Sequence, residues 1–421
     1  MNEARNDGSG RRLTWLLTSS AASHLGDGIG KVALPLLATT LTRDPVLIAG
    51  LSATQFLPWL LFAAVAGALV DRIDRRRAMI VANTARAAAV GTLAVLVAFG
   101  GMTIWLVYLT ALVIGTAETI ADSAANALIP AVVGDGSLDA ANSKLQACEI
   151  VGQTFLGGPV GSLTFALFAA LPFILNSAGF AIAAAVLLGL AGTYRAKAET
   201  PVKPAKLRTE LADGLRWLRG HALLLRLVVV AGLLSLVSEL AQAQLVLYAL
   251  EDLHLSDATY GLFAFVGGIG GLLGAGVAPR LVRATGRRVV VVGGIVCCAA
   301  GFGGMGLVRS PVAGAALFGL FAAAVVAVNV VLATARHTLV PGELLGRVLG
   351  VWRTVVWGAI PLGALLGGVL TEALGTAART FAVSGLAMLL IAGFAAVALR
   401  RFSLDDKSDS AAALTHQDPG L

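Results

Sequence analysis

The sequence predicts an all-α membrane protein whose twelve transmembrane helices form two pseudo-symmetric six-helix bundles. Three observations support this: the composition, twelve long apolar stretches, and a repeat of about 210 residues. Of the 421 residues, 57% are hydrophobic and 13% are charged, and the mean hydropathy is +0.85. A soluble domain typically carries about 25% charged residues, and a soluble chain this apolar could not cover its surface with polar groups. The composition therefore excludes a soluble enzyme, a disordered chain and, despite the net charge of +7, a nucleic-acid-binding protein.

The apolar stretches give the predicted spans. A spanning helix needs about 20 mostly apolar residues, and the chain holds twelve such stretches joined mostly by short connections. They are residues 13–41, 46–70, 78–100, 104–128, 145–168, 170–192, 223–249, 259–279, 289–308, 311–334, 349–370 and 379–399. The first is too long for the core of a signal peptide, so we expect a retained helix and no cleavage. Six glycines between residues 267 and 276 of the eighth stretch predict a close approach to another helix.

The basic residues predict the orientation. Cytoplasmic connections of membrane proteins are enriched in Lys and Arg. With the N-terminus in the cytoplasm, only Arg43, Arg309 and Arg379 fall on the opposite side, while Lys31 and Arg86 lie inside spans. We therefore expect both termini of this multi-pass protein to be cytoplasmic.

An internal repeat divides the spans into two sets of six. Three segments recur in the same order: GALVDRIDRRR (67–77) corresponds to GVAPRLVRATGRR (276–288), NALIP (126–130) to HTLVP (337–341), and GPVGSL (158–163) to IPLGAL (360–365). The repeat predicts bundles at residues 13–192 and 223–399, with cytoplasmic tails at residues 1–12 and 400–421. Parallel halves of this kind are a recurring transporter architecture, with the substrate site at their interface.

Residues 193–222 form the predicted cytoplasmic linker between the bundles. The first part is rich in Lys and Pro and is not expected to be helical. The second part, LRTELADGLRWLRGH, places leucines on one side and predicts an amphipathic helix. Such a helix lies at the cytoplasmic membrane surface, or alternatively is a solvated linker.

The segment GALVDRIDRRR resembles the signature loop of the major facilitator superfamily. Gly67, Asp71, Arg72 and Arg75 match that pattern, whereas Asp74 stands where the superfamily usually has glycine. The segments HLGDGI, PAVVGDGSLDAANS, ELADGLRWL and LVPGELLGRV are similar to the macrolide-efflux and enterobactin-exporter branch of drug–proton antiporters. The resemblance implies the major facilitator fold and a bacterial inner-membrane exporter that uses the proton gradient.

Two further features bear on that resemblance. A glycine motif over residues 152–161 resembles the fifth-span motif of antiporters, without its full glycine set. The arginine that many drug–proton antiporters carry in span four is replaced by Thr110. Proton coupling through that arginine is therefore not supported.

The signature loop predicts a gate. A carboxylate at a helix end can accept hydrogen bonds from backbone N–H groups and from a nearby arginine. We expect a latch that holds the two halves together on the cytoplasmic side in the outward-open state. Its residues are Gly67, Asp71, Arg72 and Arg75, with Asp122 as a further partner. The alternative, that the arginines only anchor the positive side, is preferred for Arg76 and Arg77.

Charged residues inside spans are the predicted mechanistic sites, because an ionisable group at mid-membrane costs several kcal/mol. Asp27 lies about 21 Å into its helix, and the repeat aligns it with Glu239. We expect Asp27, Glu239, Glu118 and Lys31 to handle protons or substrate. Alternatively, Asp27 pairs permanently with Lys31, four residues on, and Glu118 neutralises Arg86.

Other polar or aromatic residues are expected to line the cavity. They are Gln55, Trp59, Glu149, Gln242, Gln244, Asn329 and Trp357. His24 is expected to be a polar packing residue. The chain contains no GxxxxGK[ST], HExxH or CxxC motif, so we expect no enzymatic activity, no cofactor and no metal site.

The leading functional hypothesis is proton-coupled efflux of small amphipathic molecules such as drugs, by antiport and alternating access. The alternative is a dedicated exporter of one natural product or siderophore. A symporter for an anionic nutrient fits less well, because acidic residues outnumber basic ones within the spans. A non-transporting membrane protein fits less well too, because it has no use for carboxylates at equivalent depths in both halves. The expected partners are a small-molecule substrate, protons and the lipid bilayer, and the chain is expected to be a monomer.

Overall fold

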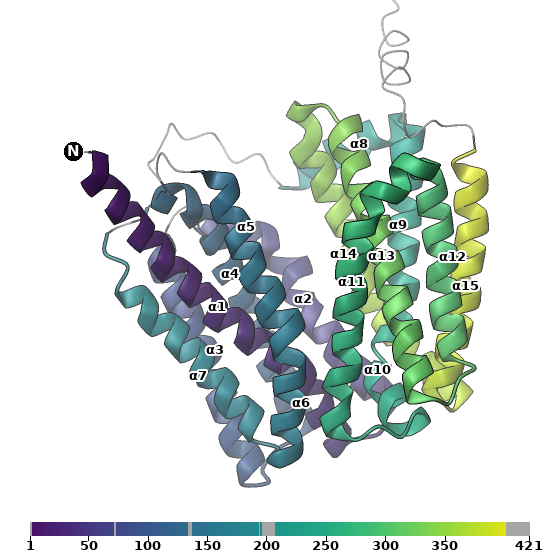
Figure 1. The fold of residues 1–421 in the computed structure, drawn as a ribbon, viewed down its shortest axis with the longest axis horizontal. Coiled ribbons are helices and arrows are strands. Elements are labelled where there is room, and N and C mark those ends of the chain that lie inside the picture. The colour runs from purple at the N-terminus through teal and green to yellow at the C-terminus, as the bar shows by residue number, and fades with distance from the viewer. Residues whose placement is uncertain (1, 71–72, 134–136, 193, 196–206, 401–421) are drawn as a thin grey trace, which may run out of the picture. The chain divides into compact units, whose positions relative to one another are not determined.

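The computed structural model describes residues 2–70, 73–133, 137–192, 194–195 and 207–400, and this part of the chain is helical with short connections (Figure 1). The helices are α1 (Asn2–Leu41), α2 (Pro45–Val70), α3 (Arg75–Ala98), α4 (Ile104–Val133), α5 (Leu138–Glu149), α6 (Gly157–Leu167), α7 (Leu171–Leu188), α8 (Leu207–Gly220), α9 (Ala222–Gln242), α10 (Leu245–Leu247), α11 (Asp257–Thr285), α12 (Arg287–Met305), α13 (Pro311–Leu339), α14 (Gly342–Leu374) and α15 (Ala377–Ala398). Two π-helical segments, η1 (Ile150–Leu156) and η2 (Tyr248–Asp252), interrupt them.

The predicted spans all lie on helices, which confirms the all-α membrane fold. Within the described residues, ten helices are long and apolar enough to cross a membrane. The first two predicted spans lie on α1 and α2, which are not among these ten helices. Pro45–Leu61 of α2 is apolar but shorter than the ten. The twelve-span count therefore stays a prediction.

One helix extends beyond its predicted span and another predicted span is divided. α1 begins at Asn2 and so runs through the residues predicted as the cytoplasmic tail, whose place outside the membrane stays a prediction. The predicted fifth span consists of α5, η1 and α6 in succession. The π segment packs closely on α1, since a Cβ at Gly28 would lie 2.6 Å from the carbonyl oxygen of Gly152. Such π bulges frequently occur at functional sites.

The chain divides into two compact units, Met1–Val202 with Ala249–Phe265, and Lys203–Tyr248 with Val266–Leu421. In the first unit α1 packs on α7, α6 and η1, α3 packs on α4 and α7, and α2 packs on α4. In the second unit α9 packs on α14 and α15, and α12 packs on α13 and α15 (Figure 1). The same pairings thus recur in the same chain order within each unit. The predicted residue bounds of the two bundles stay a prediction.

The close approach expected from the glycines of span eight is confirmed in the second unit. A Cβ at Gly270 would meet the backbone of Gly319, and one at Gly274 would meet the backbone of Ala323. The amphipathic helix predicted in the linker corresponds to α8, which packs on α14. Gly214 of α8 lies against the backbone of Arg347, and Leu218 is buried. Part of the apolar side of α8 therefore contacts protein.

The start of α3 is tied to the end of α7. Asp74 caps α3: its Oδ1 accepts from the backbone N–H of Arg77 at 2.9 Å, and its Oδ2 accepts from that of Tyr194 at 2.7 Å. Arg76 donates to the carbonyls of Leu187 and Leu188 at 2.7 and 2.9 Å, so it is more than a positive anchor. The departure of Asp74 from the superfamily pattern therefore has a structural use here, because a glycine would lack this carboxylate.

Candidate functional site

A buried ion pair joins α1 and α3 in the first unit. Arg86 is fully buried and Asp27 is 5% exposed. Arg86 Nη2 donates to Asp27 Oδ1, while its Nη1 donates to Ser23 Oγ at 2.9 Å and to Asn83 Oδ1 at 3.3 Å. The ring of Phe180 lies under the guanidinium, with its centroid 4.1 Å away. Buried charges persist in proteins when they are paired and hydrogen-bonded. The two charges here are paired, and Arg86 donates three hydrogen bonds, while Asp27 Oδ2 and Arg86 Nε have no hydrogen-bond partner among the described residues.

The pairings expected from the sequence differ from those found. Asp27 pairs with Arg86 and not with Lys31, although Lys31 is on the same helix four residues further. Lys31 Nζ instead donates to Gln153 Oε1. Arg86 is neutralised by Asp27 and not by Glu118. The physical reason is packing: the interior position of Arg86 faces α1, and the exposed Lys31 reaches the π segment.

Gln153 links Lys31 to His24 beside the ion pair, and it was not expected from the sequence. Its Nε2 lies 3.1 Å from His24 Nδ1, and that ring nitrogen lies 3.9 Å from Asp27 Oδ2. Because the amide oxygen of Gln153 accepts from Lys31, its NH₂ group donates to His24 Nδ1, so this nitrogen is the acceptor of a neutral imidazole. A hydrogen-bonded chain therefore runs from Lys31 through Gln153 to His24 and ends beside Asp27, whose Oδ2 has no hydrogen-bond partner among the described residues. The glycine motif that contains Gln153 was the available signal.

A small cavity lies beside this chain. It has a volume of about 100 Å³, room for about three water molecules. Five residues predicted as site residues line it together: Asp27, Lys31, Gln55, Trp59 and Glu118. They come from three different helices, α1, α2 and α4.

Glu118 differs from Asp27 in its surroundings. Its carboxylate forms no hydrogen bond or ion pair with the part of the chain that the structure describes, and it is half-buried at the cavity wall. Asn176 of α7, also on this wall, is 2% exposed, and its Oδ1 has no hydrogen-bond partner among the described residues. The sequence reasoning missed Asn176, because an uncharged polar residue in a span is usually a packing residue. Asp27 Oδ2, from the same cavity lining, is likewise without a hydrogen-bond partner among the described residues. A ligand could use these oxygens of Glu118, Asn176 and Asp27 as acceptors.

Two of the predicted gate residues, Arg75 and Asp122, have surroundings that the structure describes. Arg75 Nη1 donates to the carbonyl of Ala127 in α4 at 2.8 Å. Asp122 borders a narrow space with Ser23, His24 and Asn83. Asp71 and Arg72 lie outside the described residues, and for Gly67 only its place in α2 is described. The latch stays a prediction.

The remaining predicted residues do not line the described cavity. Glu149 ends α5 and is exposed. Glu239 of α9 is half-buried and lies beside α14. A Cβ placed on Gly363 of α14 would lie 3.2 Å from the Cβ of Glu239. Gln242 is the last residue of α9, and Gln244 is fully buried. Asn329 is exposed on α13. The ring centroid of Trp357 lies 5.5 Å from the guanidinium carbon of Arg353. These last five residues belong to the second unit. The proton- or substrate-handling role predicted for Glu239 and the cavity-lining roles predicted for the other four stay predictions.

Apolar helices packed in the same pairwise order in two units, with charged groups buried inside one of them, define a membrane transporter of the major facilitator superfamily. The chain belongs to that superfamily's transmembrane secretion effector family, whose family model matches residues 10–421. Transporters of this kind are not enzymes.

Two relatives and two solved structures show the range of similar proteins. The MFS-type transporter YfiS of Bacillus subtilis is 26% identical over 90% of this chain and 91% of its own. The multidrug efflux pump Tap of Mycobacterium tuberculosis is 28% identical over 94% of this chain and 95% of its own. A POT family peptide transporter has a TM-score of 0.73 at 12% identity, covering 97% of this chain and 99% of that one. The nucleoside transporter NupG, as its D323A mutant, has a TM-score of 0.72 at 14% identity, with coverages of 96% and 100%.

Proposed function

We propose that this protein is a secondary active exporter that exchanges protons for small amphipathic molecules, drugs among them, by alternating access. The observation that carries the proposal is the contrast between two carboxylates at one cavity. Asp27 forms an ion pair with Arg86, and Arg86 also donates hydrogen bonds to Ser23 and Asn83. A proton on Asp27 would leave the buried guanidinium of Arg86 without its counter-charge. Glu118 has no such partner among the described residues. We therefore assign proton exchange to Glu118 and a fixed structural role to Asp27.

The surroundings of Glu118 suit competition between a proton and a substrate. Trp59 and Phe56 provide aromatic faces on the same cavity wall, and such faces attract organic cations. Either a proton or a cationic group can neutralise the carboxylate, whose charge is costly inside a membrane. The neutral state then permits the conformational change. The similarity to the multidrug efflux pump Tap over most of both chains supports export of drug-like molecules.

The setting of the transporter is part of the proposal. We place it as a monomer in the bacterial inner membrane with both termini in the cytoplasm. We also retain Asp71, Arg72 and Arg75 as a cytoplasmic latch and Glu239 as the second charged site. Basic residues on the expected cytoplasmic side support the orientation.

Proteoliposomes that contain the full chain and a trapped pH indicator test the exchange, with ethidium and erythromycin as substrates. Wild type should move protons when either compound is added, and Glu118→Gln should lose this response while retaining downhill substrate transport. Glu149→Gln is the matched control, because Glu149 is exposed and outside the cavity. Full proton coupling in Glu118→Gln, or none in wild type with either compound, would contradict the proposal. Response to a single compound in a wider panel would favour a dedicated exporter.

A further inference from the structure

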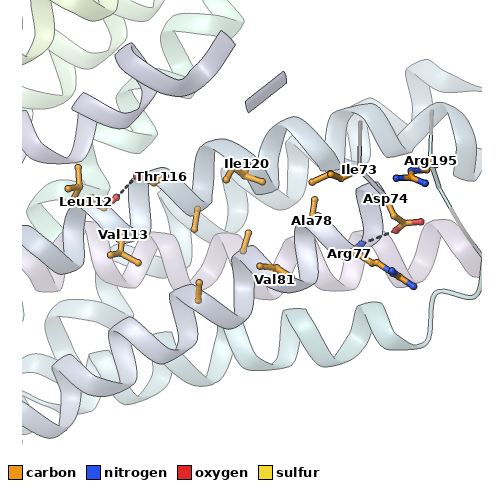
Figure 2. A pocket seen from close by; sticks show the side chains of 13 residues that line it. Ile73, Asp74, Arg77, Ala78, Val81, Leu112, Val113, Thr116, Ile120 and Arg195 are labelled. Carbon is orange, nitrogen blue, oxygen red and sulfur yellow. Dashed lines mark hydrogen bonds between the residues drawn. The ribbon is translucent and has the colours of Figure 1, made fainter. Parts of the chain in front are cut away.

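The largest cavity described in the first unit lies apart from the Glu118 site. It has a volume of about 1020 Å³ and runs between α3 and α4. Figure 2 shows Asp74, Arg77 and Arg195 at one end and Leu112, Val113 and Thr116 toward the other. The cavity therefore has a charged end and an apolar body.

The apolar body has the dimensions of one membrane leaflet. Along α3 it extends from Arg77 to Ala85, and along α4 from Leu112 to Ile120. Each stretch is about 12 Å long at the rise of an α-helix, and half of a bilayer's hydrocarbon core is about 15 Å thick. Val81 on this wall is 67% exposed, as expected for a side chain that contacts acyl chains.

The charged residues that the structure describes at this end carry a net positive charge. Arg77 and Arg195 are both exposed there. The third charged residue, Asp74, has both carboxylate oxygens engaged by the backbone N–H groups of Arg77 and Tyr194. Two guanidinium groups against one carboxylate leave a formal charge of about +1, and arginine pairs well with phosphate in a bidentate geometry.

We propose that this cavity is a binding site for an anionic glycerophospholipid, with its phosphate at Arg77 and Arg195 and an acyl chain between α3 and α4. Basic pockets between transmembrane helices at the membrane surface bind anionic headgroups. The predicted orientation enters the proposal only because it assigns this site to the cytoplasmic leaflet of the membrane. It is independent of which molecule the protein transports, so each can fail without the other.

Native mass spectrometry of the detergent-purified full chain tests this site. The probes are phosphatidylglycerol and phosphatidylcholine with identical acyl chains, and glycerol 3-phosphate as the free headgroup. Wild type should retain phosphatidylglycerol over phosphatidylcholine, and glycerol 3-phosphate should compete weakly because it lacks the acyl chain. Arg77→Gln with Arg195→Gln should weaken phosphatidylglycerol binding roughly tenfold or more. The control pair is Arg219→Gln with Arg283→Gln, two exposed arginines elsewhere, which should leave binding unchanged.

A second pair of variants tests the apolar body. Ala85→Phe would fill the cavity, whereas Ala88→Phe adds the same ring to an exposed position of the same helix outside it. Ala85→Phe should lower retention of both lipids, and Ala88→Phe should not. The proposal is overturned if wild type retains the two lipids equally, if the Arg77 and Arg195 double variant binds as wild type does, or if the two phenylalanine variants behave alike.

Discussion

The two units share a pattern of helix packing and differ in what they bury. Equivalent positions of the two units are separated by 212 residues, so that Asp27 corresponds to Glu239 and Ser23 corresponds to Ser235. By the same separation, Arg86 corresponds to Cys298 and Asn83 to Ile295. Where the first unit holds a guanidinium, the second holds a thiol, whose Sγ lies 3.9 Å from the carbonyl oxygen of Phe321. The charge network of α1 and α3 therefore has no charged counterpart on α12.

Aromatic rings fill the corresponding interior of the second unit. Phe302 stacks on Phe321 with ring centroids 3.8 Å apart and meets Phe381 edge-on at 5.0 Å. Tyr248 lies 4.7 Å from the Phe381 ring, and its hydroxyl donates to the carbonyl of Met305 at 2.8 Å. The comparison teaches that the fold requires matching shapes, while the chemistry placed within those shapes can differ between the units.

Removal of one partner of the buried pair should have the largest effect. Arg86→Leu would leave Asp27 buried without a counter-charge and should destabilise the protein by about 3–5 kcal/mol, seen as a lower unfolding temperature in detergent. Cys298→Ala, at the equivalent position, should cost much less. The double variant Asp27→Leu with Arg86→Leu should regain most of the stability, because an apolar pair of similar size can replace a buried ion pair. If Arg86→Leu alone is as stable as wild type, the buried ion pair is not a stabilising feature that distinguishes the first unit from the second.

Glycine contacts should matter equally in both units. A Cβ at Gly157 would overlap the backbone of Gly28, and one at Gly274 would overlap that of Ala323. Gly157→Ala and Gly274→Ala should each destabilise by about 1–3 kcal/mol, as overpacking does. Gly276→Ala is the control, since nothing lies within 4 Å of that position. If thermal unfolding shows the control to be as harmful as the other two, close packing is not the reason for these glycines.

Loss of the Gln153 link should have the smallest effect on stability. Gln153→Leu removes the amide between His24 and Lys31, and a net hydrogen bond is worth about 1 kcal/mol. Because Lys31 also borders the cavity, the apparent affinity for transported substrate should change while the unfolding temperature moves little. Gln146→Leu, at an exposed position of α5, should change neither. Unaltered transport by Gln153→Leu would show that the link is only structural.

The sequence predicted the helices well and the partners within them poorly. Twelve apolar stretches are visible in composition alone, and a charge within one of them, such as Asp27, is conspicuous because burial is costly. Its partner Arg86 lies 59 positions away on another helix, and only the packing of α1 and α3 shows which charges meet. The π segment was not predicted, because the apolar pattern continues through it. Gln153 and Asn176 were missed because their side chains carry no charge.

The Asp74 contacts have a consequence for the order in which the chain is assembled. The hydrogen bond from Arg77 N–H to Asp74 is local and can form as soon as α3 emerges from the ribosome. The bond from Tyr194 N–H spans 120 positions, and Arg76 reaches carbonyls 111 and 112 positions further along the chain. The start of α3 is thus secured only after α7 has been synthesised. These contacts between α3 and the end of α7 can therefore form before translation reaches α8.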